Sequence, residues 1–475
     1  MLGYKIIIYI LPLLLSFQVI ASKSTTSFEL SYYHSAEKNT RLNEILNQEF
    51  QQMPSSSSLG CNNGEYWFKL VLSDNTEKEL IAIIPTHNIN IVKLYAANNG
   101  NLTLQSISGN KVQKDKLSVD YKFPALELKN LNHNTYYLKV EFPKEANFPF
   151  KLVSQKDFYK LRIDNQSFNS FYYGLVLMVL ILNIFFYVKF KNSIFLYYTL
   201  FLFSMTLGML LYDGSLINIF RTNNFGKHIE FLARLMETVT LILFSISFLN
   251  LTVKTPKFTK STVFFPIIMV VFYVLFLMTD KFIFEALGDV LGISVFFILW
   301  VIGLRYIKKI PYAKFYVLGY LLIMPVGAYY FLGYGFGVWY IDGNIKLAKI
   351  ASFIDILVFT YALSYRLKIR DEENENMVIE LKAFIENSTF SKKSEPKNVE
   401  PYLQLLIKNN ISSEPLSLRE LEVFKAIMEG LTNTQIAEKL FISINTVKTH
   451  NRKIYKKLNI SNKVEMKDKI SSKEF

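Results

Sequence analysis

Cysteine is nearly absent from this sequence of 475 residues, in which Cys61 is the only one. A single cysteine excludes an intrachain disulfide and leaves no second thiolate for a redox pair or a cysteine-based metal site. Because cysteine is among the residue types most often buried, we expect Cys61 to be a structural, buried thiol. The sequence predicts no metal, no cofactor and no catalytic residue, and therefore a class of protein other than an enzyme.

Acidic residues are missing from one stretch near the C-terminus. None lies between Glu438 and Glu465, although the formal net charge of the whole chain is +14. A local excess of positive charge of this kind predicts a polyanion as partner. The basic residues in the stretch are Lys439, Lys448, Arg452, Lys453, Lys456, Lys457 and Lys463.

Apolar residues, by contrast, are abundant. They make up 51% of the chain and the mean hydropathy is +0.21, too high for a set of ordinary soluble domains of this length. At the N-terminus, Lys5 precedes an apolar run at 6–20, and Ala21 is a small residue suited to cleavage before Ser22. This pattern predicts a signal peptide at 1–21, with an uncleaved anchor helix as the alternative.

Residues 22–165 have the pattern of a β-sandwich. Short runs rich in β-branched and aromatic residues alternate with turn-forming pieces such as "ANNGN" and "NLNHN", which is typical of an exported antiparallel sandwich. The runs lie at 66–74, 79–85, 89–97, 125–131, 135–142 and 148–154. Strand aromatics usually pack in the core, and stacking on a sugar is the alternative. The aromatics in question are Tyr66, Trp67, Tyr95, Tyr136 and Tyr137.

Residues 166–364 contain apolar stretches of about the length that crosses a bilayer. We predict seven transmembrane helices, at 171–188, 194–211, 231–251, 263–278, 287–304, 315–332 and 347–363. An odd number places the two ends of the chain on opposite sides of the membrane. Lysine and arginine concentrate in the loops that this arrangement places inside, such as 254–260 and 305–314, which agrees with the positive-inside rule. We therefore predict a multi-pass protein of the bacterial cytoplasmic (inner) membrane, with its N-terminal domain outside and its C-terminal domain in the cytoplasm.

Charged residues inside the predicted spans are costly unless they are paired or face a wet cavity. Glu230, Arg234 and Glu237 are four and three residues apart, so they share one face of the third helix. Asp289 and Asp355 are further candidate partners for Arg234. Two interpretations remain open: an internal ion pair that fixes helix packing, and a role in passing a signal or binding an ion.

Residues 365–411 connect the last span to the C-terminal region. The part at 364–387 has few helix breakers and is predicted to continue the seventh helix, either as a solvated connector or as a weak coiled coil. The piece "NSTFSKKSEPKNVEP" that follows has the composition of a linker. We expect the protein to act as a homodimer.

Residues 412–475 carry the signals of three short helices. Ser417 with Glu420, and Thr432 with Gln435, have capping-box spacing, and Ser443 is a candidate cap for the third helix. On that third helix Val447, Ile454 and Leu458 share one face. The roughly opposite face carries Asn445, Lys448, Thr449, Arg452 and Lys456. One face is thus predicted to pack and the other to bind.

The stretch "LSLRELEVFKAIMEGLTNTQIAEKLFISINTVKTHNRKIYKKLNI" resembles the LuxR-type helix-turn-helix domain over about fifty residues. In that family the third helix enters the major groove. The resemblance implies base contacts from Lys448, Thr449 and Arg452, and His450 is interpreted as structural. It further implies backbone contacts from Asn445, Thr446, Lys456 and Thr432. The alternative is a helix-turn-helix retained for protein binding or dimerisation.

The rest of the chain resembles the bacterial seven-transmembrane receptors with diverse intracellular signalling modules, through its architecture and the segments "GEYWFKLVLSDN" and "NTYYLKVEF". That family combines an exported jelly-roll-like sensor domain, often likened to carbohydrate-binding domains, with seven helices and an exchangeable cytoplasmic output. The combination predicts a one-component sensor that couples an extracytoplasmic, carbohydrate-like ligand to DNA binding. The alternatives are an accessory sensor whose tail binds a partner regulator, and a transporter or channel with a regulatory tail.

Overall fold

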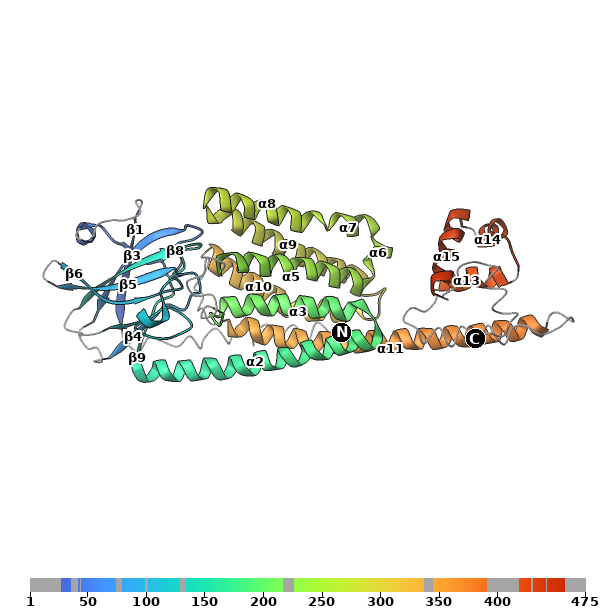
Figure 1. Cartoon of the computed structure of the whole chain (residues 1–475), viewed down its shortest axis with the longest axis horizontal. Helices are drawn as coiled ribbons and strands as arrows, with labels where there is room; N and C mark the ends of the chain where they lie inside the picture. Colours follow the sequence, from blue (N-terminus) through green and yellow to red (C-terminus); the bar gives the residue numbers. More distant parts are fainter. Residues whose placement is uncertain are drawn as a thin grey trace. The chain divides into compact units, whose positions relative to one another are not determined.

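The computed structural model describes residues 27–35, 42, 44–73, 79–98, 101–128, 134–216, 226–336, 345–390, 418–428, 430–440 and 442–457. The predicted signal peptide and most of the predicted linker lie outside these ranges. The chain divides into two compact units, Met1–Tyr187 with Ser193–Ala362 and Val188–Asn192 with Leu363–Phe475. The first unit holds a β domain and a helical bundle, and the second holds the helical segment 363–390 and three short helices (Figure 1).

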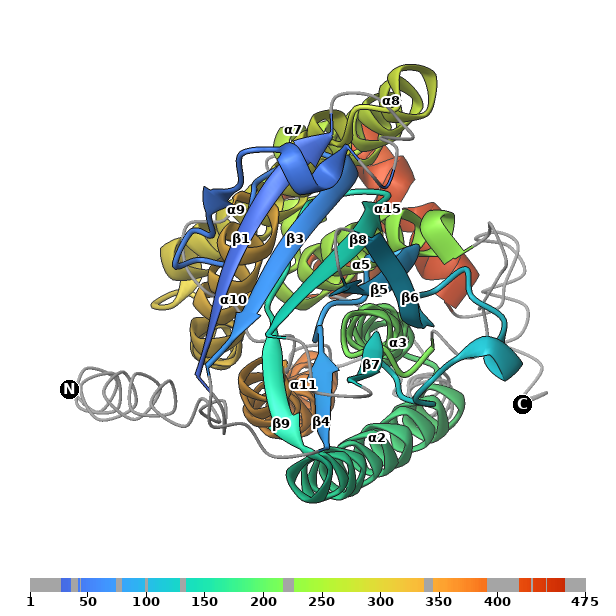
Figure 2. The ribbon, with the colours of Figure 1, turned by 90° about the vertical axis from the view of Figure 1, so that its left-hand side faces the viewer.

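The β domain is a sandwich of two antiparallel sheets (Figures 1 and 2). The larger sheet has the strand order β2-β1-β3-β8-β5-β6, and the smaller has the order β7-β4-β9. Two single-turn helices, η2 (Ile45–Asn47) and η3 (Lys114–Lys116), lie in its loops. The strands are β1 (Phe28–Ser35), β2 (Gln51–Gln52), β3 (Gly64–Leu72), β4 (Leu80–Ile83), β5 (Ile91–Asn98), β6 (Asn101–Ser108), β7 (Ala125–Leu128), β8 (Thr135–Phe142) and β9 (Lys151–Ser154).

The predicted antiparallel sandwich is confirmed, and the six predicted runs overlap β3, β4, β5, β7, β8 and β9. Sequence reasoning missed β1, β2 and β6. Both β2 and β6 are edge strands, and β1 pairs with β2. Edge strands keep polar residues on their solvent side, as "NLTLQSIS" in β6 does. Their apolar pattern is therefore weak.

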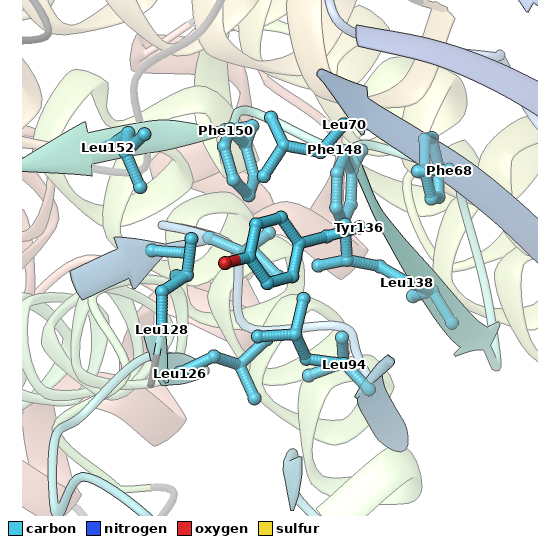
Figure 3. Packing of buried hydrophobic residues seen from close by; sticks show 14 of the residues in the cluster. Phe68, Leu70, Leu94, Leu126, Leu128, Tyr136, Leu138, Phe148, Phe150 and Leu152 are labelled. Carbon is cyan, nitrogen blue, oxygen red and sulfur yellow. The ribbon is translucent and has the colours of Figure 1, made fainter. Parts of the chain in front are cut away.

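The core of the sandwich fills the space between the two sheets. Phe68, Tyr136 and Leu138 of the large sheet face Leu126 and Leu152 of the small sheet, and all five are fully buried (Figure 3). Trp67, Tyr95 and Tyr137 pack in a second cluster. With Tyr66 at 2% exposed, all five strand aromatics considered for sugar stacking are buried, so packing is confirmed as their role.

A bundle of long helices follows the sandwich. Seven helices among the described residues are long and apolar enough to cross a membrane, which matches the seven predicted spans. The first begins directly after β9, so it starts earlier in the sequence than predicted. The helices are α2 (Gln155–Phe190), α3 (Ser193–Tyr212), α5 (Gly226–Leu249), α6 (Leu251–Lys254), α7 (Pro256–Ser261), α8 (Phe264–Thr279), α9 (Phe282–Tyr306), α10 (Ala313–Phe336) and α11 (Lys346–Phe390).

Helix α11 is much longer than a membrane span requires. It has 45 residues, which correspond to about 68 Å at the α-helical rise, whereas the hydrocarbon core is about 30 Å thick. The part of α11 that is long and apolar enough to cross the membrane is Lys346–Glu372. The prediction that the seventh helix continues beyond the span is confirmed, and a coiled coil stays a prediction.

The C-terminal unit contains α13 (Leu418–Met428), α14 (Asn433–Lys439) and α15 (Ile444–Lys457). Its core is formed by Val423, Ile436, Val447 and Ile454, which are all fully buried. Gly430 has a φ of +83°, a left-handed conformation that favours glycine after the end of a helix. Of the predicted packing face, Leu458 lies outside the described residues.

Candidate DNA-binding helix and membrane-embedded ion pairs

Two caps fix the starts of α14 and α15. The backbone N–H of Gln435 donates to the hydroxyl of Thr432 over 3.3 Å, and the Thr432 N–H donates to the Gln435 side chain over 2.9 Å. The N–H of Thr446 donates to the hydroxyl of Ser443 over 3.0 Å. Each cap satisfies backbone donors that the first helical turn leaves free. The sequence placed both caps correctly.

The two faces of α15 differ in exposure as predicted. Val447 and Ile454 are fully buried against α13 and α14. The opposite face, called the basic face here, consists of the exposed residues Asn445, Lys448, Thr449, Arg452 and Lys456. Within the part of the chain that the structure describes, the side chains of Lys448, Arg452 and Lys456 form no ion pair. Their charges are therefore available to a polyanion.

Lys457 does not belong to that face, although it is one of the basic residues in the acid-free stretch. Its ammonium group lies 2.7 Å from a carboxylate oxygen of Glu420, which is 4% exposed. Arg419 of α13 similarly donates to the carbonyl oxygen of Leu440 over 2.5 Å. These two contacts tie α13 to α15 and to the end of α14. A pair so far apart in sequence has no local signal, so sequence reasoning missed it.

The predicted hydroxyl contacts to DNA already have intramolecular partners. The Thr449 hydroxyl donates to the carbonyl oxygen of Asn445 over 2.9 Å, and the hydroxyls of Thr446 and Ser443 are 2.8 Å apart. Thr432 is exposed but serves the α14 cap. Their oxygens can still accept hydrogen bonds. The cations therefore dominate the chemistry of the basic face.

His450 and Asn451 lie on the packing side of α15. His450 is half-buried, and burial lowers the pKa of its imidazole below the ordinary value. Nearby charges have smaller effects on this pKa, and these effects oppose one another. The amide of Asn451 donates to the side chain of Asn433 over 2.9 Å and so joins α15 to α14. This arrangement agrees with a structural role for His450.

A second group of charges connects the sandwich to the bundle. Lys144, in the loop between β8 and β9, is 1% exposed and lies 2.6 Å from both Glu230 of α5 and Glu285 of α9. Burial opposes the charged form of Lys144, but the two carboxylates outweigh it and raise its pKa above the ordinary value. Sequence reasoning missed Lys144 and Glu285, because they come from distant parts of the chain.

The predicted charged face of α5 joins this group. Arg234 forms ion pairs with Glu230 and with Asp289 of α9, so two of its candidate partners are found. The side chain of Glu237 forms no hydrogen bond or ion pair with any described residue. Asp355 of α11 forms no ion pair with Arg234, and neither of its buried carboxylate oxygens has a hydrogen-bond partner among the described residues. Spacing within one helix predicts which of its residues share a face. It does not predict which residues of other helices lie opposite that face at the same depth in the membrane.

Another buried ion pair holds the start of α11. Lys349 pairs with Asp213, which follows α3, and both residues are almost completely buried. Tyr173 of α2 donates to Asp213 over 2.7 Å, and Lys349 donates to Asn169 of α2 over 2.6 Å. In the sequence Lys349 interrupts an apolar span, and the structure shows that its charge is compensated. Helices α2 and α11 are thereby joined through Asp213.

Further contacts join the sandwich to the helices. The rings of His87 and Tyr212 pack edge to face with centroids 4.8 Å apart, and the His87 imidazole lies 3.5 Å from Glu230. The amide of Asn63 donates to the carbonyl oxygen of Asp280 over 2.8 Å. The sandwich therefore contacts α3, α5 and the α8–α9 loop. These contacts connect the sandwich directly to the helices of the bundle.

Three family models match successive parts of the chain. Residues 28–154 match "7TMR-DISM extracellular 2", and residues 165–366 match "7TM diverse intracellular signalling". Residues 414–469 match "Bacterial regulatory proteins, luxR family". The first two models end close to the sandwich and bundle boundaries, and the third includes α13, α14 and α15.

Several curated transcriptional regulators are similar to a short part of the chain, 53 to 63 residues long. The transcriptional regulatory protein LiaR of Bacillus subtilis is 47% identical over 57 residues, which cover 12% of this chain and 27% of LiaR. The oxygen regulatory protein NreC of Staphylococcus carnosus is 45% identical over 60 residues, which cover 12% of this chain and 28% of NreC. The chain thus spans little more than a quarter of the length of these relatives. It belongs to the seven-transmembrane receptors with diverse intracellular signalling modules and carries a LuxR-type helix-turn-helix domain at its C-terminus.

Proposed function

We propose that this protein is a membrane-bound one-component regulator, in which an extracytoplasmic signal controls DNA binding by the C-terminal domain of the same chain. The observation that carries the proposal is the exposed basic face of α15, with three cations that have no partner within the described structure. The other two domains of the same chain match families of extracellular and seven-transmembrane signalling modules.

The proposed orientation follows from the sequence. The sandwich lies outside the cytoplasmic membrane and the LuxR-type domain lies in the cytoplasm, because the loops on the proposed inner side carry most of the lysines and arginines. The protein acts as a homodimer, since helix-turn-helix proteins commonly read two half-sites with two recognition helices.

The proposed coupling runs through α11. Its first turns are held by the Lys349–Asp213 ion pair, and the same continuous helix runs on to Phe390. A signal changes DNA binding if it favours one of two arrangements of α11 in the bundle, because a ligand shifts an equilibrium only by its differential affinity for the two states.

DNA footprinting with the purified fragment 412–475 tests the proposal. We expect protection of a discrete site in the promoter region of its own gene, and loss of that protection in the double variant Lys448→Ala, Arg452→Ala. Circular dichroism shows whether the variant is folded. A folded double variant that protects the same site equally well would remove α15 as the reading element and favour a tail that binds a partner regulator.

A further inference from the structure

A cavity of about 240 Å³ lies inside the bundle at the end that contacts the sandwich. Helices α3, α5, α8, α9, α10 and α11 all contribute to its wall, and Glu145 of the β8–β9 loop lines it from the sandwich. For comparison, an apolar cavity of about 150 Å³ holds a benzene molecule. The space in the bundle is therefore large enough for a small organic molecule.

Small and flexible side chains create this space. A Cβ added at Gly208 of α3 or Gly327 of α10 would meet no atom within 4 Å, so both glycines open onto empty volume. Methionines line the wall from three helices, with Met205 on α3, Met269 on α8 and Met324 on α10. Methionine adapts its shape to different partners, which is typical of surfaces that bind small molecules.

The charges at the wall of the cavity are unbalanced. Among the described residues that line it, Arg234 is the only cation, and this guanidinium is already shared between Glu230 and Asp289. Glu237 also lines the cavity and has no hydrogen-bond or ion-pair partner among the described residues. The Glu145 carboxylate accepts a hydrogen bond from the Asn88 amide over 2.7 Å, which leaves Glu237 as the unpaired acid among the described residues that line the cavity. An unpaired carboxylate at this depth is costly unless something compensates it.

Aromatic rings add a second preference for a cation. Phe296 and Tyr330 are among the residues that line the cavity, whereas the ring of Tyr212 already faces the Arg234 guanidinium at 5.5 Å. The faces of aromatic rings attract organic cations, and such attraction strengthens when water is excluded. A lipid chain or a neutral apolar molecule would fill the space and leave Glu237 without a partner.

We propose that this cavity binds a small organic ammonium ion with an apolar body of about six to eight carbon atoms. The ammonium group pairs with Glu237, and the apolar body packs among the methionines and aromatic rings. The site lies in the transmembrane bundle and is distinct from the sandwich, whose candidate sugar-stacking aromatics are buried in its cores.

The position of the cavity suits a signal that reaches α11. Ala348 of α11 lines it, one residue before Lys349, which pairs with Asp213. An occupant therefore contacts the first turn of the helix that leads to the cytoplasmic domain. This consequence for DNA binding rests on the proposed function, whereas binding of the ammonium ion does not.

Calorimetric titration of the full chain in lipid nanodiscs tests the site. The probes are 2-phenylethylamine, its neutral analogue 2-phenylethanol, and the anion 3-phenylpropanoate. We expect binding of the amine alone, weakened about tenfold or more by Glu237→Gln, because a hydrogen bond to a charged group contributes at least that much. Glu372→Gln, at an exposed position of α11, is the matched control and should bind as the native chain does.

A second pair of variants tests the place of binding. Gly327→Leu should fill the cavity and abolish binding of the amine. Gly174→Leu of α2 is its control, because a Cβ there also meets no atom within 4 Å but the residue does not line the cavity. Absence of amine binding, equal binding of all three probes, or unchanged binding in Glu237→Gln would each overturn the proposal. Footprinting of the tail is independent of these titrations. Failure of the amine-binding proposal can therefore be distinguished from failure of the proposed DNA binding.

Discussion

Substitution of two neighbouring lysines at the end of α15 should affect two different properties, DNA binding in one case and stability of the domain in the other. Lys456 is exposed on the basic face, whereas Lys457 lies 2.7 Å from the buried Glu420. We expect Lys456→Ala to weaken binding to every DNA sequence and to leave the fold intact. Lys457→Ala should instead destabilise the domain, because it removes a cation that lies against the buried Glu420 carboxylate.

The magnitude follows from the charges on the basic face. Lys448, Arg452 and Lys456 can each neutralise one phosphate, and each phosphate contact contributes about 0.9 to the slope of log affinity against log salt. Three contacts predict a loss of about 40-fold in affinity per domain between 50 and 200 mM salt. Two contacts predict a loss of about 12-fold over the same range, so Lys456→Ala should lower the slope of log affinity against log salt by about one third.

Fluorescence anisotropy with a labelled DNA duplex of arbitrary sequence measures this slope for the fragment 412–475, because phosphate contacts are independent of sequence. Urea unfolding followed by circular dichroism measures the stability of both variants. The reasoning would be refuted if Lys456→Ala kept the native salt slope, or if Lys457→Ala lowered the slope and left the unfolding midpoint unchanged.

Four further predictions concern the core of the tail, the topology, the connector and the single thiol. Val447→Ala should destabilise the C-terminal domain by about 2 to 3 kcal/mol, whereas Ile444→Ala, at a side chain 42% exposed, should cost far less in urea unfolding. Alkaline phosphatase fused after Lys160 should be active and a cytoplasmic fluorescent reporter fused after Glu386 should fluoresce, and the reverse pattern would disprove the orientation. Insertion of one residue near Glu375 rotates the rest of α11 by about 100°, and insertion of four residues rotates it by about 40°. Either insertion should therefore abolish the normal response of a target-promoter reporter. An intact response to both insertions would show that α11 is a passive tether. Burial, with a smaller effect of Glu145, raises the pKa of Cys61 to about 11. Maleimide labelling should therefore rise with pH up to that value and be about a hundredfold slower at pH 8 than for an unperturbed thiol, because the thiolate is the reactive form; labelling at the rate of an exposed cysteine would contradict this.

Sequence reasoning predicted the elements whose signals are local. The caps at Thr432 and Ser443, the buried Val447 and the basic face of α15 all follow from spacing within one or two helical turns. The apolar spans are equally local, because one bilayer length of apolar residues is enough to predict each of them.

Contacts between distant segments escaped prediction. Lys144 and Glu285 are 141 residues apart, and Lys349 and Asp213 are 136 apart, so no periodic pattern joins them. The cavity depends on the way six helices converge around Gly208 and Gly327, and in the sequence these glycines look like any others in a membrane span. The edge strands β2 and β6 were missed for a different reason, since their polar residues face solvent.

The central claim is that one chain both resides in the membrane and reads DNA. Genome-wide crosslinking of the full-length protein to DNA in cells tests it most directly, with the double variant Lys448→Ala, Arg452→Ala as the control at equal membrane abundance. We expect discrete enriched DNA regions for the native chain and their loss in the double variant. Absence of enrichment, or the same enriched regions in the double variant, would contradict the claim.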